Sequence, residues 1–246
     1  MTQASVGFHC PECLNRGGQQ VYQGPVGFDP LVTKVLIGLN IVLSAAALIG
    51  GGSLGRLTGS VLRDWSLFGP LVDDGETYRI VTSAFLHDGL VHLGFNMMAL
   101  WILGSSIEQL FGRPRFVALY AVSMLGGAFG MLLLDPVTPA VGASGAVFGL
   151  FGAVAVTQRA QGINVWQSGL GVVLGLNLLI TFAVPQISIG GHLGGLAAGT
   201  ALTVGLVPLA RARSAEWVPI VAAVVMSAML YAGCVWAASQ WLDPVL

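Results

Sequence analysis

The chain has 246 residues, of which 55% are hydrophobic and 9% are charged. Soluble proteins carry about 25% charged residues, so this composition excludes an ordinary soluble domain and indicates an integral membrane protein. A formal net charge of −1 provides no basic surface, and we expect no nucleic-acid partner.

Apolar runs long enough to cross a bilayer recur along the chain, since a spanning helix needs roughly 20 apolar residues. These runs lie at about 31–50, 89–110, 115–134, 143–160, 166–184, 190–210 and 217–241. They predict seven helices and three parts of the chain. The parts are a cytoplasmic N-terminal segment at 1–30, a six-helix core at 31–210, and a linker with a seventh helix at 211–246.

The positions of the basic residues predict the orientation, because cytoplasmic loops are enriched in Lys and Arg. With the N-terminus in the cytoplasm, seven of the ten Lys and Arg lie inside and three lie outside. We therefore expect a multi-pass protein of a cell membrane, of the bacterial plasma-membrane type, with its C-terminus outside. The three outer basic residues belong to one long connection, 51–88, whose aromatic residues suit the membrane interface.

Few polar side chains interrupt the apolar runs, and each is a candidate for function because polar groups are costly in lipid. His92 and Asn96 stand one helical turn apart in the second run, and His87 comes just before them. Ser144 opens the fourth run and His192 opens the sixth. Since these three runs all start on the outer side, we expect four of these side chains, Ser144, His192, His92 and Asn96, at a similar depth.

Glycines follow Ser144 and surround His192 at helical spacing. Small residues four apart let membrane helices approach closely. The fourth run carries Gly145, Gly149 and Gly152, and the sixth carries Gly191, Gly195 and Gly199. This pattern predicts that the two helices meet and bring Ser144 within hydrogen-bonding reach of His192.

These side chains suit acyl transfer. A serine hydroxyl becomes a nucleophile when an adjacent base removes its proton, and His192 is the candidate base for Ser144. Donors for an oxyanion are available from Asn96, His92 and the backbone N–H of Ser144. No Asp or Glu lies in the fourth or sixth run, which favours a Ser-His dyad over a triad.

Each residue also has a structural interpretation. Ser144 alone would usually be a packing residue, and the His92–Asn96 pair could be an interhelical hydrogen-bonding device. Glycine stripes also occur in transporters, although a transport pathway would need polar residues through the full bilayer. A metal-dependent protease would need HExxH or a comparable ligand set, which is absent from the sequence.

Three stretches resemble the signatures of the rhomboid family of intramembrane serine proteases, namely HDGLVHLGFN, VGASGAVFG and GHLGGLAAG. The resemblance also takes in ETYR and LGSSIEQLFG, and it covers about residues 30–210. It implies an all-α polytopic membrane protein with a six-helix core and a seventh C-terminal transmembrane helix. It also implies a Ser144–His192 dyad without a cofactor, with His92, Asn96 and the Ser144 N–H at the oxyanion.

The resemblance implies substrates as well, which are single-span membrane proteins cleaved within or near the outer end of their transmembrane helix. The alternative function is a catalytically weak or inactive rhomboid-like protein that binds membrane helices. Gly142 matches a small residue that shapes the turn before the nucleophile, and Phe148 stands where many bacterial members have a tyrosine stacked on the histidine. The other supporting positions on the matching stretches are Arg79, His87, Glu108, Gly145, Gly195 and Gly199.

The N-terminal stretch VGFHCPEC resembles the tail of a zinc-binding segment found in some actinobacterial members of that family. A structural zinc site takes four ligands, and His9, Cys10 and Cys13 offer three at most. Either the remaining ligands were lost upstream or the motif is vestigial, so we expect no metal in this chain.

Overall fold

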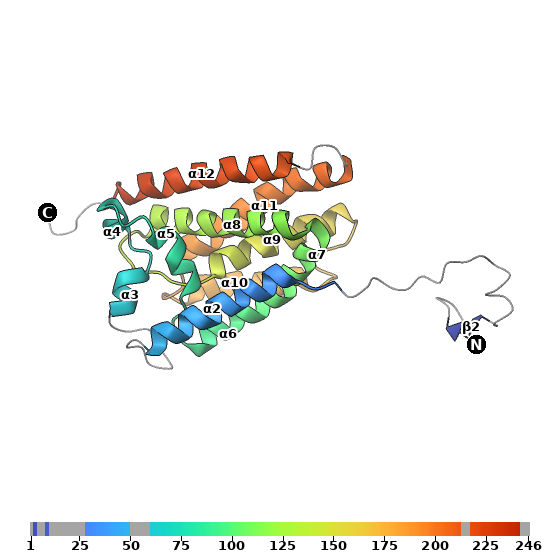
Figure 1. Ribbon diagram of the computed structural model, residues 1–246, viewed down its shortest axis with the longest axis horizontal. Helices are drawn as coiled ribbons and strands as arrows, with labels where there is room; N and C mark the ends of the chain where they lie inside the picture. Colours follow the sequence, from blue (N-terminus) through green and yellow to red (C-terminus); the bar gives the residue numbers. More distant parts are fainter. Residues whose placement is uncertain (1, 4–7, 10–27, 50–59, 213–216, 242–246) are drawn as a thin grey trace.

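A computed structural model of the protein describes residues 2–3, 8–9, 28–49, 60–212 and 217–241 (Figure 1). The described chain is helical apart from loops and two paired strands of two residues each, β1 (Thr2–Gln3) and β2 (Phe8–His9). The longer helices are α2 (Leu31–Ile49), α6 (Leu90–Ala99), α8 (Arg113–Leu134), α9 (Ser144–Ala160), α10 (Leu170–Ala183), α11 (Ile189–Ala212) and α12 (Val218–Ala238). Shorter ones are α3 (Ser60–Trp65), α4 (Gly69–Asp73), α5 (Arg79–Thr82), η1 (Ser83–Phe85), η2 (Leu100–Gly104) and α7 (Ser105–Phe111).

The described part of the chain contains four helices that are long and apolar enough to cross a membrane. They are Leu90–Phe111, Arg113–Leu134, Ile189–Val207 and Val218–Ala238, the first of which joins α6, η2 and α7. The protein is therefore an all-α polytopic membrane protein, which confirms the expected fold class. Helices occupy each predicted apolar run, while the number that cross the membrane stays a prediction.

The largest difference from the predicted starts is in the fifth run, which begins at about 166, whereas α10 begins at Leu170. The side-chain oxygen of Asn164 accepts the backbone N–H of Trp166 at 2.9 Å, which forms a turn there instead. Gly169 then takes a φ of +81°, a conformation that favours glycine, immediately before the helix.

Glycines hold α8, α9 and α11 together at the centre of the molecule. A methyl group on Gly199 would lie 2.5 Å from Cα of Gly149, and one on Gly127 would lie 2.9 Å from Cα of Gly145. Both distances are too short for carbon atoms, so the backbones themselves are in contact. A methyl group would also overlap a neighbouring helix at Gly126, Gly130, Gly152, Gly190, Gly194 and Gly195. The two predicted stripes thus pack together, and α8 adds a third glycine face that the sequence pattern did not single out.

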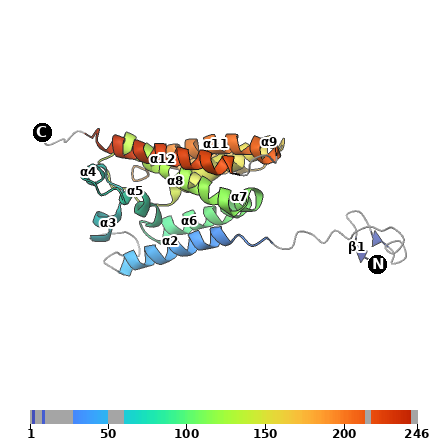
Figure 2. The same cartoon turned by 45° about the horizontal axis from the view of Figure 1, so that its top comes forward.

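The helix α12 lies along α8, on the opposite side of the bundle from α2 and α6 (Figures 1 and 2). The buried thiol of Cys234 contacts the Leu125 carbonyl oxygen at 3.8 Å. Beyond the end of α12, the indole N–H of Trp241 donates to the Asp73 carboxylate at 3.3 Å. This bond puts the C-terminal end of α12 beside α4, on the same side as the 60–88 segment.

Glu108 fixes the start of α2 from a distant helix. Its carboxylate is fully buried and accepts the backbone N–H groups of Val32 at 3.0 Å and Thr33 at 2.8 Å. The Thr33 hydroxyl donates to the same carboxylate at 2.8 Å, and the Arg113 guanidinium lies 3.7 Å away. Because the first N–H groups of a helix have no partners within it, Glu108 acts as a long-range helix cap.

Candidate functional site

Ser144 is the first residue of α9, immediately after a turn that only glycine fits. Gly142 has a φ of +132°, and its N–H donates to the Ser83 carbonyl oxygen at 2.9 Å. A methyl group on Gly142 would lie 2.8 Å from Cε1 of His92. The turn before Ser144 therefore depends on glycine for both its conformation and its space.

His192 lies in the first turn of α11 and is 9% exposed. Its ring stacks on Phe148 of α9, with centroids 4.0 Å apart and planes 19° apart. On α10, the Thr181 hydroxyl oxygen lies 2.7 Å from His192 Nδ1. The imidazole is therefore held on its face by α9 and at one nitrogen by α10.

The starts of α9 and α11 are in contact beside these two residues. A methyl group on Gly145 would lie 3.3 Å from the Gly191 carbonyl oxygen, and one on Gly195 would overlap the Gly145 carbonyl. Ser144 precedes Gly145 and His192 follows Gly191, so the glycine contact brings both to one place. Within the described residues, Ser144 and His192 are not hydrogen-bonded to each other. Catalytic hydrogen bonds often shorten only when substrate binds.

His92 lies beside the Gly142 turn, and Asn96 lies one helical turn further along α6. The backbone N–H of Asp88 donates to His92 Nδ1 at 3.4 Å, so a neutral His92 ring carries its proton on Nε2. That nitrogen would lie 2.9 Å from a methyl group on Gly142, close to the start of α9. The buried Asn96 side chain donates to the His92 carbonyl oxygen at 3.0 Å, and its amide has a second N–H.

His87, which precedes α6, links the start of α9 to α2. Its Nε2 accepts the backbone N–H of Ala143 at 3.4 Å, and its Nδ1 lies 3.1 Å from the Ser44 hydroxyl. The ring is 1% exposed and lies edge-on to His92, with centroids 5.1 Å apart. His87 thus supports the residue that precedes Ser144.

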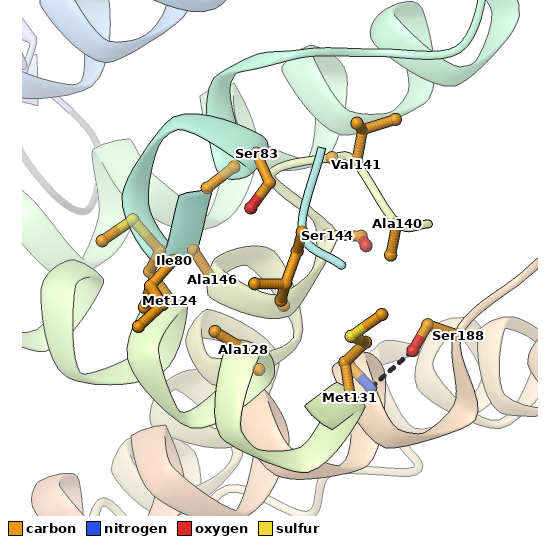
Figure 3. A pocket seen from close by; sticks show the side chains of 16 residues that line it. Ile80, Ser83, Met124, Ala128, Met131, Ala140, Val141, Ser144, Ala146 and Ser188 are labelled. Atoms are coloured by element: carbon orange, nitrogen blue, oxygen red, sulfur yellow. Dashed lines mark hydrogen bonds between the residues drawn. The ribbon is translucent and has the colours of Figure 1, made fainter. Parts of the chain in front are cut away.

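A pocket opens beside Ser144 (Figure 3). Figure 3 shows Ser144 with Ser83 on one side of the pocket and with Ser188 and Met131 on the other. The Ser188 hydroxyl oxygen accepts the Gly191 N–H at 3.0 Å and so completes the first turn of α11. The remaining wall comes from α5, η1 and α8, from the loop before Ser144 and from the starts of α9 and α11, and it reaches Gly191, the residue before His192.

The segment before α6 is held by Arg79, which is 2% exposed. Its guanidinium donates to the Ser66 carbonyl oxygen at 3.0 Å and to the Glu76 carboxylate at 2.7 Å. The Tyr78 hydroxyl also donates to Glu76, at 2.8 Å. These hydrogen bonds, that of Tyr78 first, lower the pKa of the Glu76 carboxyl group, and the same contact raises the pKa of Tyr78. Arg79 and Tyr78 therefore order the loop that borders the pocket.

The remaining expected residues lie elsewhere. Glu108 caps α2 and is separate from the Ser144 pocket, while Gly195 and Gly199 belong to the contact between α9 and α11. Cys10 and Cys13 lie outside the described residues, as does the side chain of His9, so the candidate metal ligands stay untested. Thr181 was missed, because threonine is ordinary in an apolar helix and nothing in the sequence links it to His192.

Comparisons of this chain with known proteins all point to the same family. The family model of the rhomboid domain matches residues 74–209. The chain is 34% identical over 173 residues to Rhomboid protease GluP of Bacillus subtilis (strain 168), which covers 69% of this chain and 34% of that protein. It is also 34% identical over 168 residues to RHOMBOID-like protein 5 of Arabidopsis thaliana, covering 59% of this chain and 54% of that protein.

A third relative has a name that bears on activity. The chain is 33% identical over 132 residues to Inactive RHOMBOID-like protein 8 of Arabidopsis thaliana, covering 51% of this chain and 37% of that protein. The matches thus span between about a third and about a half of the length of these three relatives.

Proposed function

Because the chain belongs to the rhomboid family, we propose that it is an intramembrane serine endopeptidase in which Ser144 is the nucleophile and His192 the general base. The observation that carries this proposal is the meeting of α9 and α11 at Gly145, Gly191 and Gly195. This contact lies next to both side chains, and the stack of His192 on Phe148 aligns the ring with α9.

The chemistry follows from these positions. His192 takes the proton of the Ser144 hydroxyl as the oxygen attacks the scissile carbonyl carbon, and it then gives that proton to the leaving amine. Water subsequently hydrolyses the acyl-enzyme ester and restores the serine. Each step moves one proton through a single imidazole, so the dyad needs no metal or cofactor.

Three donors are proposed for the oxyanion. The backbone N–H of Ser144 is free because it lies in the first turn of α9, where the helix dipole also favours negative charge. His92 offers Nε2–H beside Gly142, and Asn96 offers its second amide N–H. Preorganised donors of this kind typically contribute roughly 100-fold or more to rate.

The proposed substrates are single-span membrane proteins, cleaved within or near the outer end of the transmembrane helix. We place the N-terminus in the cytoplasm and the C-terminus outside a plasma membrane, on the distribution of Lys and Arg. The contact of Trp241 with Asp73 supports a C-terminus on the same side as the 60–88 segment. A water-filled pocket near that surface would allow polar backbone to occur at this depth.

We propose the division of the chain that the sequence predicts, with a cytoplasmic N-terminal segment at 1–30, a six-helix core at 31–210, and a linker with a seventh transmembrane helix at 211–246. The rival function is a rhomboid-like protein that binds membrane helices with little or no cleavage. Loss of Ser144 or His192 would favour that alternative, and both residues are present.

The test is cleavage of a single-span reporter by the purified full chain in proteoliposomes. Ser144→Ala and His192→Ala are each expected to abolish cleavage, because each removes one half of the proton transfer. Ser83→Ala is the matched control, since its side chain lines the same pocket and has no step in the mechanism. It should cleave at close to the wild-type rate.

Covalent labelling separates the enzyme from the rival. A fluorophosphonate should label wild-type protein and Ser83→Ala but not Ser144→Ala. Undiminished cleavage by Ser144→Ala would reject the mechanism. Absence of both labelling and cleavage in folded wild-type protein would favour the helix-binding alternative.

A further inference from the structure

Thr181 occupies an unusual position on α10. Most side chains of this helix face outward, and its buried residues are Gly171 and Thr181. Thr181 is 1% exposed, and its hydroxyl oxygen lies 2.7 Å from His192 Nδ1. It is therefore the side chain through which α10 reaches the candidate base.

Counting protons gives the direction of this hydrogen bond. A hydroxyl has one proton, and the Thr181 hydroxyl donates to the Asn177 carbonyl oxygen at 2.7 Å. Thr157 and Thr203, which are also buried, donate in the same way to the carbonyls of Ala153 and Gly199, each at 2.7 Å. With its proton directed to its own helix, Thr181 has only lone pairs to offer, so His192 Nδ1 must be the donor.

That direction fixes the state of the imidazole. A neutral ring carries a single proton, so a protonated Nδ1 leaves Nε2 unprotonated. A general base for serine needs an unprotonated nitrogen. The opposite tautomer would place a proton on Nε2 and leave His192 unable to accept the hydroxyl proton of Ser144.

We propose that Thr181 is a positioning residue that selects the Nδ1–H tautomer of His192 and leaves Nε2 free for Ser144. The inference rests on the proposed protease function. When Nε2 takes the serine proton, the Nδ1–H bond to Thr181 also stabilises the imidazolium that forms. In soluble serine proteases a carboxylate orients the base. A neutral hydroxyl can do so in a membrane helix without the cost of burying a charge.

The experiment compares three substitutions at one position with a matched threonine elsewhere. Thr181→Val keeps the shape of the side chain and removes the acceptor, and it should lower kcat roughly 10-fold with little change in KM. Thr181→Ser keeps the hydroxyl and should restore kcat to within about twofold of wild type. Thr181→Cys replaces that oxygen by sulfur, a weak acceptor, and its kcat should be lower than that of Thr181→Ser.

The control is Thr157→Val, which removes an equivalent buried hydroxyl that donates to its own helix and that, among the described residues, forms no hydrogen bond with a histidine. It should leave kcat unchanged. Wild-type kcat in Thr181→Val would overturn the proposal, as would a folded Thr181→Ser no better than Thr181→Val. If Thr181→Val does not fold, the ratio of Thr181→Ser to Thr181→Cys decides, and equal kcat values would count against the proposal.

Failure of this inference is distinguishable from failure of the proposed function. Full cleavage by Ser144→Ala would reject the serine mechanism altogether. Loss of cleavage in Ser144→Ala together with full activity in Thr181→Val would reject only the role of Thr181.

Discussion

The helices around Ser144 are held in two different ways. Between α8, α9 and α11, glycines allow backbone to touch backbone, and the starts of α9 and α11 are fixed by that contact. The helix α10 has mostly outward-facing side chains and reaches the same site through Thr181. Similarly, the start of α2 is fixed by the Glu108 carboxylate. The difference teaches that the position of Ser144, the proposed nucleophile, depends on helix packing, whereas the tautomer of His192, the proposed base, depends on one polar side chain.

The largest effect is expected where backbones touch. Gly195→Ala places a methyl group into the Gly145 carbonyl and should cost about 3 kcal/mol of stability, together with loss of reporter cleavage. Gly205→Ala on the same helix is the control, because a methyl group there meets nothing within 4 Å. The measurement is thermal unfolding in detergent alongside cleavage. Equal stability of Gly195→Ala and Gly205→Ala would contradict a close backbone contact at Gly195.

A smaller effect is expected where one side chain holds a helix. Glu108→Gln replaces one of the two carboxylate oxygens by an NH2 group. The N–H groups of Val32 and Thr33 and the Thr33 hydroxyl would then share one acceptor, so the free energy of unfolding should fall by about 1–2 kcal/mol. Thermal unfolding should show the loss, while kcat of the folded protein stays near wild type. The exposed neighbour Gln109→Ala serves as control. A fall in kcat without a fall in stability would contradict the capping role.

The stack on His192 is expected to affect rate more than stability. Phe148→Leu removes an aromatic contact and should lower kcat roughly 5-fold, whereas Phe148→Tyr keeps the ring and should remain active. Phe151→Leu is the matched control, since Phe151 packs against Phe148 and is likewise buried. Reporter kinetics would refute the role of the stack if Phe148→Leu and Phe151→Leu behaved alike.

The smallest effect is expected at Gly175 on α10. A methyl group on Gly175 meets nothing within 4 Å, and alanine favours helix more than glycine does. Gly175→Ala should therefore leave stability unchanged or raise it by up to about 1 kcal/mol, with cleavage retained. A loss of stability as large as that of Gly195→Ala would mean that α10 is packed as tightly as α11.

Much of this arrangement was predictable from sequence. Apolar length located the helices, and glycine spacing beside Ser144 and His192 predicted that α9 and α11 meet. The glycine face of α8 was not predicted, because Gly126, Gly127 and Gly130 are not adjacent to a candidate catalytic residue. Thr181 was missed for a different reason. Its contact with His192 depends on the orientation and position of α10 relative to α11, which the sequence around Thr181 does not determine.

The glycine contacts also limit how this protein can change. Every single-base change in a glycine codon that replaces the residue introduces at least a Cβ atom. At Gly130, Gly190, Gly194 and Gly195 that atom would overlap the backbone of a neighbouring helix. No smaller step is available to mutation at these positions, since glycine is already the minimum. Adaptation of this protein is therefore expected to leave the α8–α9–α11 contact unchanged and to proceed through substitutions in α10, α2 and the 60–88 segment.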